Sequence, residues 1–348
     1  MEADGQVDVA QIGDEAAADW DAWVTAAPAA SIYHRYRWRH IVRKVFARET
    51  FYLAARRQGH LCGILPIVRL KSRLFGDFLV SVPYFNYGGV VGESGEVEQR
   101  LVDQACELAR ALGVSHLELR HRTGASASLP ARTDKVTLLL DLPSSPAALL
   151  KSLDSKVRAQ IKRPQREGAT CRRGGAELLP DFYTVFAENM RDLGTPVYPK
   201  SFFAEMLAAF PTETSLFAVY LGGAPVAAGF VLGARGVLEI PWASSLRRAN
   251  SVGVNMLLYW SILEFACQSG YSRFDFGRCT VDSGTYRFKR QWGAQPEQLY
   301  WHYWMREAGE LPRINHSSPK FEAAIAAWRR LPLPIANRLG PLLVRNLP

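Results

Sequence analysis

The fold is decided by two matching stretches, FYLAARRQGHLCGIL at residues 51–65 and SLFAVYLGGAPVAAG at residues 215–229. Each reads as a strand, a turn that contains glycine, and a second strand. The match places Gly59 opposite Gly223, so the two copies lie 164 residues apart. The same hairpin is therefore expected twice in the chain.

A second matched pair follows the hairpins. GVSHLELR at residues 113–120 corresponds to GYSRFDFG at residues 270–277, at an offset of 157 residues. A helical pattern precedes both copies, amphipathic in the first and apolar nearly all round over residues 254–266. Strand hairpins are common enough to match by coincidence, but two matched segments in the same order favour a duplication. The expected fold class is α/β, with α+β layers in two related halves.

The charge of the chain is unevenly distributed. The 348 residues include 42 Lys and Arg and 33 Asp and Glu, which gives a formal net charge of +9. Residues 1–30 contain seven of the acids and no Lys or Arg, so the remainder carries +16. A basic body suggests an anionic ligand: a nucleic acid, a nucleotide, an acidic lipid surface or an acidic glycan. The hydrophobic fraction of 48% excludes a disordered chain and a collagen-like repeat.

Several kinds of site have no support in the sequence. The five cysteines form no CxxC and the seven histidines show no metal-ligand spacing, so no metal site is expected. Motifs for phosphate-binding loops, dinucleotide binding, zinc hydrolysis and a nucleophile elbow are absent. The N-terminal residues show no secretory pattern and no apolar run approaches a membrane span. We therefore expect a cytoplasmic, reducing location.

A basic segment separates the two halves. After a strand at residues 136–142, Ser144 or Ser145 is expected to cap one helix that begins at Pro146 and is kinked or ended by Pro164. Residues 151–173 carry a net charge of +6. A charge run of this kind is usually a solvated face, but its clustering favours binding of phosphates or of an acidic glycan.

The most specific stretch lies at residues 274–305. Asp275 is expected to point away from its two phenylalanine neighbours on a strand that ends at Gly277. Beyond it, aromatic and basic side chains alternate, so a strand would place Arg287 and Lys289 on one face. Two such cations suit a carboxylate, a phosphate or a developing oxyanion, whereas the structural alternative is a solvated edge strand.

These motifs resemble a known family. DFGRCTVDSGTYRFKRQWG at residues 275–293 resembles the signature of FemAB-like transferases, which are tandem GNAT-fold proteins, and SKVRAQIKRPQREGA at residues 155–169 resembles their basic interdomain segment. VPYFNYGGV at residues 82–90 and NMRDLGTPVYPKSFF at residues 189–203 resemble the FemAB-related branch associated with exosortase and PEP-CTERM exopolysaccharide systems. The resemblance runs from about Trp38 to the C-terminus.

The resemblance implies two GNAT-like domains. We expect an acidic segment at residues 1–30, a first domain at 31–140, a second domain at 141–305 that begins with the basic helix, and an amphipathic tail containing proline at 306–348. The implied activity is transfer of an acyl or aminoacyl group, from acyl-CoA or aminoacyl-tRNA as co-substrate, to an amine on a cell-envelope or exopolysaccharide-related acceptor. No bound cofactor is implied.

The resemblance also implies residue roles. Lys289, in the position of the family's FK motif, is expected to stabilise charge on the transferred group, and Tyr286 and Arg287 to orient the substrates. Asp275 is either a general base or an ion-pair partner of Arg273 or Arg278.

The expected donor site departs from a typical CoA-binding loop. Residues 250–255 keep a glycine, Gly253, before a helix, and Asn255 follows it within the helix. They lack the Arg or Gln that usually begins a CoA-binding loop, and Arg247 and Arg248, just upstream, are the candidates to replace it. Trp242 is either a lining of the acyl pocket or a core residue. The acceptor or another anion is expected at six further residues: Lys156, Arg158, Lys162, Arg163, Asn86 and Tyr87.

Two alternatives stay open at the level of sequence. The protein is an enzyme in which the amine attacks the donor directly, or a non-catalytic basic module that binds tRNA or an acidic glycan. Expected partners are a small-molecule, glycan or lipid-linked acceptor and tRNA, but not DNA. The tail either lies on an anionic membrane surface or packs on the second domain, and its short apolar stripe favours packing.

Overall fold

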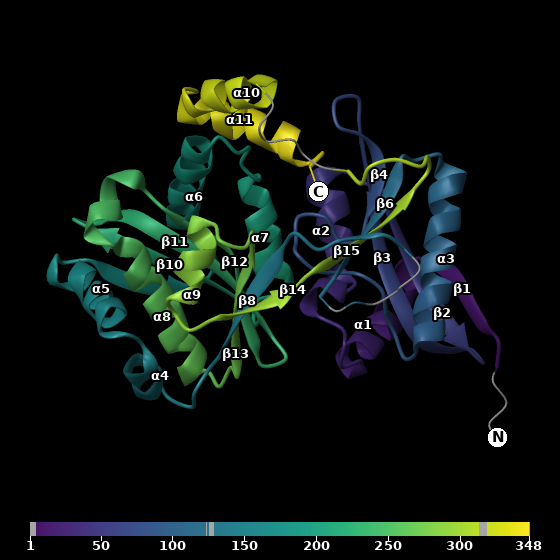
Figure 1. Ribbon diagram of the computed structural model, residues 1–348, viewed down its shortest axis with the longest axis horizontal. Coiled ribbons are helices and arrows are strands. Elements are labelled where there is room, and N and C mark those ends of the chain that lie inside the picture. Colours follow the sequence, from purple (N-terminus) through teal and green to yellow (C-terminus); the bar gives the residue numbers. More distant parts are fainter. Residues whose placement is uncertain (1–4, 123, 125–128, 313–318, 348) are drawn as a thin grey trace. The chain divides into compact units, whose positions relative to one another are not determined.

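The computed structural model describes residues 5–122, 124, 129–312 and 319–347. Its residues form two compact units (Figure 1). Unit 1 comprises Met1–Val136, Gln298–Arg313 and Arg345–Pro348, and unit 2 comprises Thr137–Glu297 and Ile314–Val344. Residues 298–305, expected in the second domain, thus belong to unit 1.

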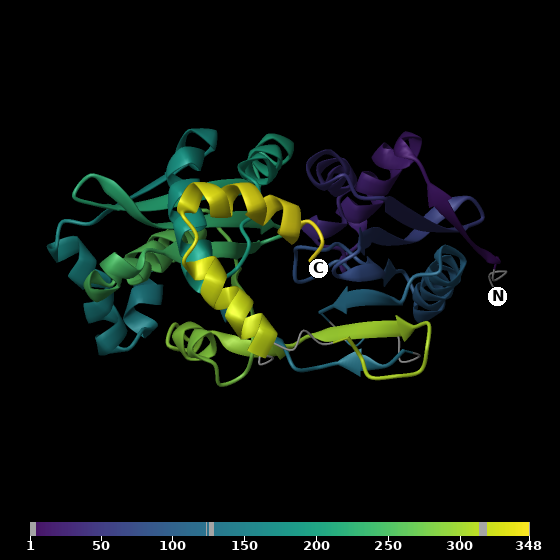
Figure 2. The same ribbon diagram turned by 90° about the horizontal axis from the view of Figure 1, so that it is seen from above.

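Unit 1 is built on a mixed sheet. Its strands run in the order β1 (Val7–Ile12), β2 (Thr50–Arg57), β3 (His60–Ser72), β4 (Gly76–Val80), β6 (His116–His121), β15 (Tyr300–Met305) and β7 (Ala131–Arg132), while β5 (Val91–Gly92) pairs with β3. β4 and β6 are parallel, and β15 is antiparallel to both β6 and β7 (Figure 2). The acidic N-terminal segment therefore contributes β1 to this sheet.

Helices cover both faces of the first sheet. α3 (Gly95–Leu112) packs Val97, Leu101 and Ala105 against the face that carries Leu53. α1 (Ala17–Ala26) packs Trp20 against the opposite face, which carries Tyr52. Neighbouring residues of β2 point to opposite faces because the side-chain period of a strand is two, so each face has its own core.

Unit 2 repeats this plan. Its strand order is β14 (Gln295–Gln298), β8 (Val136–Asp141), β13 (Arg273–Cys279), β12 (Val237–Ser245), β11 (Ala224–Ala234), β10 (Thr214–Leu221) and β9 (Thr170–Gly174). α8 (Val254–Gln268) lies over Gly229 of β11, while the neighbouring Phe230 contacts Phe182 of α6 (Leu179–Leu193). The two helices therefore cover opposite faces, and α8 is buried along most of its length.

The duplication is confirmed in the strand positions. β2 and β3 begin at residues 50 and 60, and β10 and β11 begin 164 residues later, at 214 and 224. β6 and β13 begin 157 residues apart, at 116 and 273. Gly59 and Gly223 occupy the same turn position with φ of +82° and +79°, a conformation that glycine adopts without a Cβ clash.

Two local predictions were wrong. The basic segment forms two helices, α4 (Pro146–Ser152) and α5 (Ser155–Arg166), because Leu153 and Asp154 adopt ψ of 148° and 149° between them. Residues 284–290 form helix α9 (Gly284–Arg290) rather than a strand. The Ser283 hydroxyl caps α9 by accepting a hydrogen bond from the Tyr286 N–H at 3.1 Å, a local signal stronger than the alternation of side chains.

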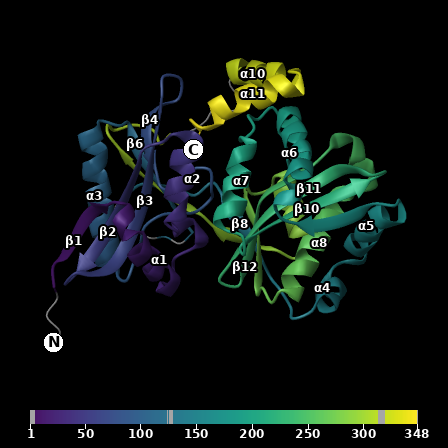
Figure 3. The ribbon, with the colours of Figure 1, turned by 180° about the vertical axis from the view of Figure 1, so that it is seen from behind.

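The two helices of the C-terminal tail pack in unit 2, whereas Arg306 and Arg345 belong to unit 1. α10 (Pro319–Arg329) and α11 (Leu333–Val344) both contact α6 (Figure 3). Arg191 of α6 donates to the Leu331 carbonyl at 3.2 Å. Within the described residues, no helix combines the length and hydropathy that a bilayer-spanning segment requires.

Candidate functional site

A cavity of about 480 Å³ opens within unit 2. It lies where α5, the end of β12, the N-terminal end of α8 and the region of α9 meet. Its lining is mainly polar and consists of Gln160, Arg163, Ser245, Asn250, Ser251, Gly253, Asn255, Met256, Phe288 and Gln291.

The N-terminal end of α8 gives this cavity its chemistry. The first backbone N–H groups of a helix have no partner within the helix and carry a partial positive charge. Gly253, the N-cap of this 15-residue helix, has no side chain to cap them, and the first turn contains no acidic residue. The φ of Gly253 is +84°, so the turn requires glycine for its backbone conformation, although a Cβ would meet no atom closer than 3.8 Å. This end of the cavity suits an anion.

The corresponding helix of unit 1 lacks this property. The Ser94 side chain caps α3 by accepting a hydrogen bond from the Val97 N–H at 3.4 Å. Glu96 and Glu98 occupy its first turn, where their carboxylates oppose the binding of another anion. Of these two described helix ends, that of α8 suits an anion and that of α3 does not.

The two parallel strands beside α8 separate as they approach its N-terminal end. β12 and β13 pair from Val237↔Arg273 to Glu239↔Asp275. Pairing stops there, while β12 continues to Ser245, a lining residue of the cavity, and β13 continues to Cys279. Backbone groups beyond the last pair are therefore available to partners other than the neighbouring strand.

Lys289 lies against the end of β13. Its Nζ donates to the carbonyl oxygens of Gly277 at 2.6 Å and Arg278 at 3.1 Å. The side chain is only 5% exposed, and desolvation lowers the pKa of Lys289. Lys289 is not a lining residue of the cavity. The contacts show a lysine that fixes the backbone of the strand end.

Asp275 is buried in the same strand. Its Oδ1 accepts hydrogen bonds from the Thr137 hydroxyl at 2.6 Å and from the Gly277 N–H at 2.8 Å. Arg273, one of its two expected ion-pair partners, pairs with Asp141 at 2.9 Å. A carboxylate held by these donors stabilises the backbone of β13 at Gly277, where φ is +75° and where the strand, expected to end, continues to Cys279.

Arg287 does not form a pair with Lys289, contrary to the expectation from a strand. Residues two apart on a helix point in nearly opposite directions. Arg287 is exposed and donates from Nη1 to the Asp282 carbonyl at 3.0 Å, whereas Lys289 is buried. Tyr286 is half-buried in the first turn of α9.

The expected donor residues fall into two groups. Gly253 and Asn255 line the cavity. Trp242 instead packs in an aromatic cluster, with ring centroids 5.2 Å from Phe203 and 5.6 Å from Phe230.

The two arginines proposed as substitutes for the missing CoA-loop residue lie against α6. Arg247 donates to the Asp192 carbonyl at 2.7 Å, and Arg248 pairs with Glu188 at 2.5 Å. Neither is a lining residue of the cavity.

Of the expected anion-binding residues, only Arg163 lines the cavity. Its Nε also pairs with Glu167 at 3.1 Å. Arg158 donates to the Leu153 carbonyl, while Lys156 and Lys162 are exposed on α5 outside the lining.

Asn86 and Tyr87 belong to unit 1. Tyr87 is 4% exposed, and the guanidinium of Arg122 lies over its ring at 5.2 Å. Asn86 is half-buried. Tyr87 therefore packs against another residue of the first unit.

Sequence reasoning missed half of the lining. Asn250 and Ser251 lie in the expected donor loop without having been singled out, and the residues not proposed for a site are Gln160, Ser245, Met256, Phe288 and Gln291. Ser245 to Met256 could have been found because they lie close to Gly253 in the sequence. No local pattern indicates that α5 and α9 also contribute to this cavity.

Part of unit 2 matches a known protein family. Residues 155–290 match the family described as acetyltransferase (GNAT) domain. No curated protein sequence matches the chain. The family match therefore covers the part of unit 2 that contains nine of the ten lining residues of the cavity, all except Gln291.

Solved structures resemble the chain over most of its length. The structure of FemX has a TM-score of 0.61 and 15% identity, covering 84% of this chain and 96% of that one. A tandem GNAT protein from the clavulanic acid biosynthesis pathway has a TM-score of 0.52 and 14% identity, covering 88% and 100%. L-PGS from Bacillus licheniformis has a TM-score of 0.51 and 13% identity, covering 78% and 87%. The chain therefore has a duplicated GNAT-like fold, and the family match supports a GNAT-type acyltransferase.

Proposed function

We propose that unit 2 transfers an acyl or aminoacyl group from a phosphate-bearing donor to an amine. The observation that carries the proposal is the cavity at the N-terminal end of α8, which has no side-chain cap and no acidic residue in its first turn. Helix N-termini of this kind bind phosphate through backbone N–H groups. The GNAT family match over residues 155–290 supports the acyl-transfer chemistry.

In the proposed reaction the acceptor amine attacks the carbonyl carbon of the donor. A C–N bond forms, and the C–S bond of an acyl-CoA or the C–O bond of an aminoacyl-tRNA breaks. The proton lost by the amine is matched by one gained by the leaving thiol or hydroxyl. Binding both substrates in one orientation supplies much of the rate, so this transfer requires no covalent enzyme intermediate.

The proposed roles of residues follow their positions. Gly253, Asn255 and Arg163 bind donor phosphate, because they line the cavity. Lys289 positions the end of β13 through its bonds to the Gly277 and Arg278 carbonyls.

The proposed acceptor is an amine on a glycan or a lipid-linked cell-envelope precursor. The FemAB resemblance of residues 275–293 supports this class, and the motifs at residues 82–90 and 189–203 support a link with exosortase and PEP-CTERM exopolysaccharide systems. In this proposal the exposed cations Lys156 and Lys162 on α5 attract an anionic acceptor or tRNA.

A donor screen tests the proposal. Purified protein is incubated with radiolabelled acyl-CoAs or with tRNAs charged with labelled amino acids, together with amino sugars as acceptors. Transfer of label to an amine is expected with one donor class, which also identifies it. Saturable donor binding without transfer to any amine would favour the non-catalytic binding module, and absence of donor binding would contradict both functions.

Charge reversal on α5 tests the cavity. Arg163→Glu is expected to weaken donor binding at least tenfold, because it replaces a cation in the cavity lining with a carboxylate. Arg166→Glu is the matched control: it makes the same exchange at an exposed position of the same helix but lies outside the lining. Titration calorimetry measures both variants. Equal losses would indicate general attraction by the basic segment rather than binding in the cavity.

A further inference from the structure

Exposed large apolar side chains gather at two places in the described part of the chain. Leu74 and Phe75 form the tip of the turn between β3 and β4 in unit 1, with exposures of 73% and 37%. Ile335, Leu339 and Leu342 lie on α11 in unit 2, with exposures of 47%, 41% and 52%. None of these five residues lines the proposed acyl-transfer cavity.

α11 has two apolar faces, only one of which is used by the fold. Ala336, Gly340 and Val344 form the buried face, and a Cβ on Gly340 would lie 2.7 Å from the Val197 backbone nitrogen. Ile335, Leu339 and Leu342 recur at i, i+4 and i+7, which places them in one stripe on the opposite side. The helix is thus docked on unit 2 and still presents an apolar stripe outward.

The surroundings of this stripe are cationic. Residues 329–347 contain Arg329, Arg330, Arg338 and Arg345 and no acidic residue. Arg338 is exposed on α11 beside the stripe, and the exposed Arg345 directly follows Val344, the last residue of the helix. A helix with an apolar stripe and neighbouring arginines is typical of an element that lies in the interface of an anionic bilayer.

The turn between β3 and β4 repeats this combination. Lys71 and Arg73 are exposed beside Leu74 and Phe75. The Ser72 hydroxyl accepts hydrogen bonds from the Leu74 N–H at 3.1 Å and the Phe75 N–H at 3.4 Å, which fixes the shape of the turn.

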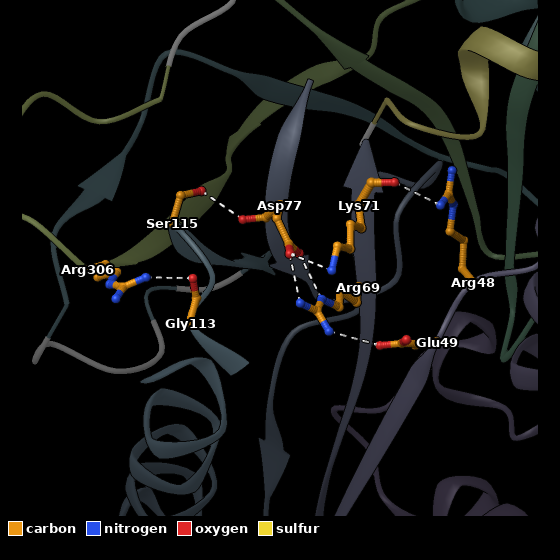
Figure 4. A network of polar contacts seen from close by, with 8 residues as sticks. All are labelled: Arg48, Glu49, Arg69, Lys71, Asp77, Gly113, Ser115 and Arg306. Atoms are coloured by element: carbon orange, nitrogen blue, oxygen red, sulfur yellow. Dashed lines mark hydrogen bonds and ion pairs between the residues drawn. The ribbon is translucent and has the colours of Figure 1, made fainter. Parts of the chain in front are cut away.

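The base of the hairpin is held firmly. Arg69 of β3 binds Asp77 of β4 in a bidentate pair, Nε to Oδ1 at 2.8 Å and Nη2 to Oδ2 at 2.7 Å (Figure 4). Arg48 donates to the Lys71 carbonyl at 3.1 Å. The apolar tip therefore extends from a braced hairpin.

We propose that the α11 stripe and the β3–β4 tip are membrane-binding elements that insert apolar side chains into an anionic lipid bilayer. Basic side chains beside each set would meet lipid phosphates, while leucine, isoleucine and phenylalanine enter the region of the acyl chains. The absence of acidic residues from residues 329–347 favours an anionic surface over a protein partner of mixed charge. The proposal stands independently of the donor and acceptor proposed for unit 2.

Vesicle co-sedimentation of the full chain tests the proposal. Wild type is expected to sediment with vesicles that contain phosphatidylglycerol, to bind at least tenfold more weakly to phosphatidylcholine vesicles, and to be released as salt is raised. The triple variant Ile335→Ser, Leu339→Ser, Leu342→Ser and the double variant Leu74→Ser, Phe75→Ser are each expected to reduce binding at least fivefold. Their combination should abolish it.

The control is Val281→Ser, which removes another apolar side chain with 46% exposure outside both elements. It should bind vesicles like wild type. Absence of wild-type sedimentation, or equal binding by all variants, overturns the proposal. Concentration-dependent dimerisation in analytical ultracentrifugation that the same variants remove, without vesicle binding, would show that a second copy occupies these surfaces instead. Transfer to a soluble acceptor, measured in parallel, separates this outcome from failure of the proposed enzyme activity.

Discussion

Replacing Lys289 by methionine is expected to lower the free energy of unfolding of unit 2 by about 2 kcal/mol, because each buried carbonyl left without its hydrogen bond costs about 1–3 kcal/mol. The carbonyls of Gly277 and Arg278 would lose the Nζ that now binds them. Removal of a desolvated ammonium group offsets part of the loss, since burial already lowers the pKa of Lys289. Urea unfolding measures the difference. Arg287→Met, an exposed neighbour on α9, is the control for stability and should change it by less than about 0.5 kcal/mol.

The same substitution is expected to reduce acyl transfer at least tenfold through kcat, with little change in donor affinity, because Lys289 lies outside the cavity lining. A folded variant with wild-type stability and turnover would exclude both the positioning role and the expected catalytic role.

The pH dependence of the Lys289 effect has a defined sign. The folded-state pKa is lowered, so between it and the ordinary value of 10.5 the unfolded chain binds more protons than the folded chain. Stability of wild type relative to Lys289→Met should therefore rise as the pH increases toward 10.5, and stay constant above it.

Acidification is expected to destabilise unit 1. Burial lowers the pKa of His34 to about 4 and that of His121 to about 3, against an ordinary value of 6.5. Between the folded and unfolded pKa values the unfolded chain binds more protons, so stability is greatest above pH 6.5 and is lost as the pH falls. The shift of His34 from 6.5 to about 4 corresponds to about 3 kcal/mol at the acid end of this range.

The hydrogen bonds of the neutral His121 and His302 rings explain why protonation destabilises unit 1. The Val90 N–H donates to His121 Nε2 at 3.1 Å, so the proton of neutral His121 resides on Nδ1, which faces His302 Nδ1 at 3.1 Å. This network assigns the tautomers. A second proton on His121 would oppose the Val90 N–H, and one on His302 would oppose the Nδ1–H of His121.

Hydrogen exchange of β6 and β15 peptides between pH 7 and pH 4 measures the loss of stability of unit 1 on acidification. His34→Gln should flatten the pH dependence after correction for intrinsic exchange rates, while His60→Gln, a change at an exposed histidine of the same unit, should leave it as in wild type. Equal pH slopes in all three proteins would show that the buried histidines do not control the acid transition.

The sequence was informative where the signal was local. The paired hairpins, their glycine turns and the apolar helix 254–266 follow from short patterns, and each lies within a few residues of its expected position. The alternation over residues 286–292 was misleading. In the structure, Tyr259 of α8 packs beside Phe288 with ring centroids 5.0 Å apart, and that long-range contact is invisible in the local pattern.

The site was predicted only in part, because local patterns indicate some of its residues and long-range contacts decide the others. Gly253 and Asn255 were found because a glycine before a helix is a local feature, and Arg163 because the basic run is conspicuous. Arg247 and Arg248 are equally basic, but α6 supplies the Asp192 carbonyl and the Glu188 carboxylate that bind them. No spacing rule connects residues 188–192 with residues 247–248.

The position of β15 affects how the protein is made. Residues 300–305 complete the sheet of unit 1 beside β6, yet they follow the whole of residues 137–297 in the chain. During synthesis, β6 therefore cannot pair with β15 until unit 2 has left the ribosome. An unpaired edge is a template for association with other chains, so the delay is a period of risk for the nascent protein. A fragment ending at residue 136 would remain permanently in that incomplete state, with His121 deprived of His302.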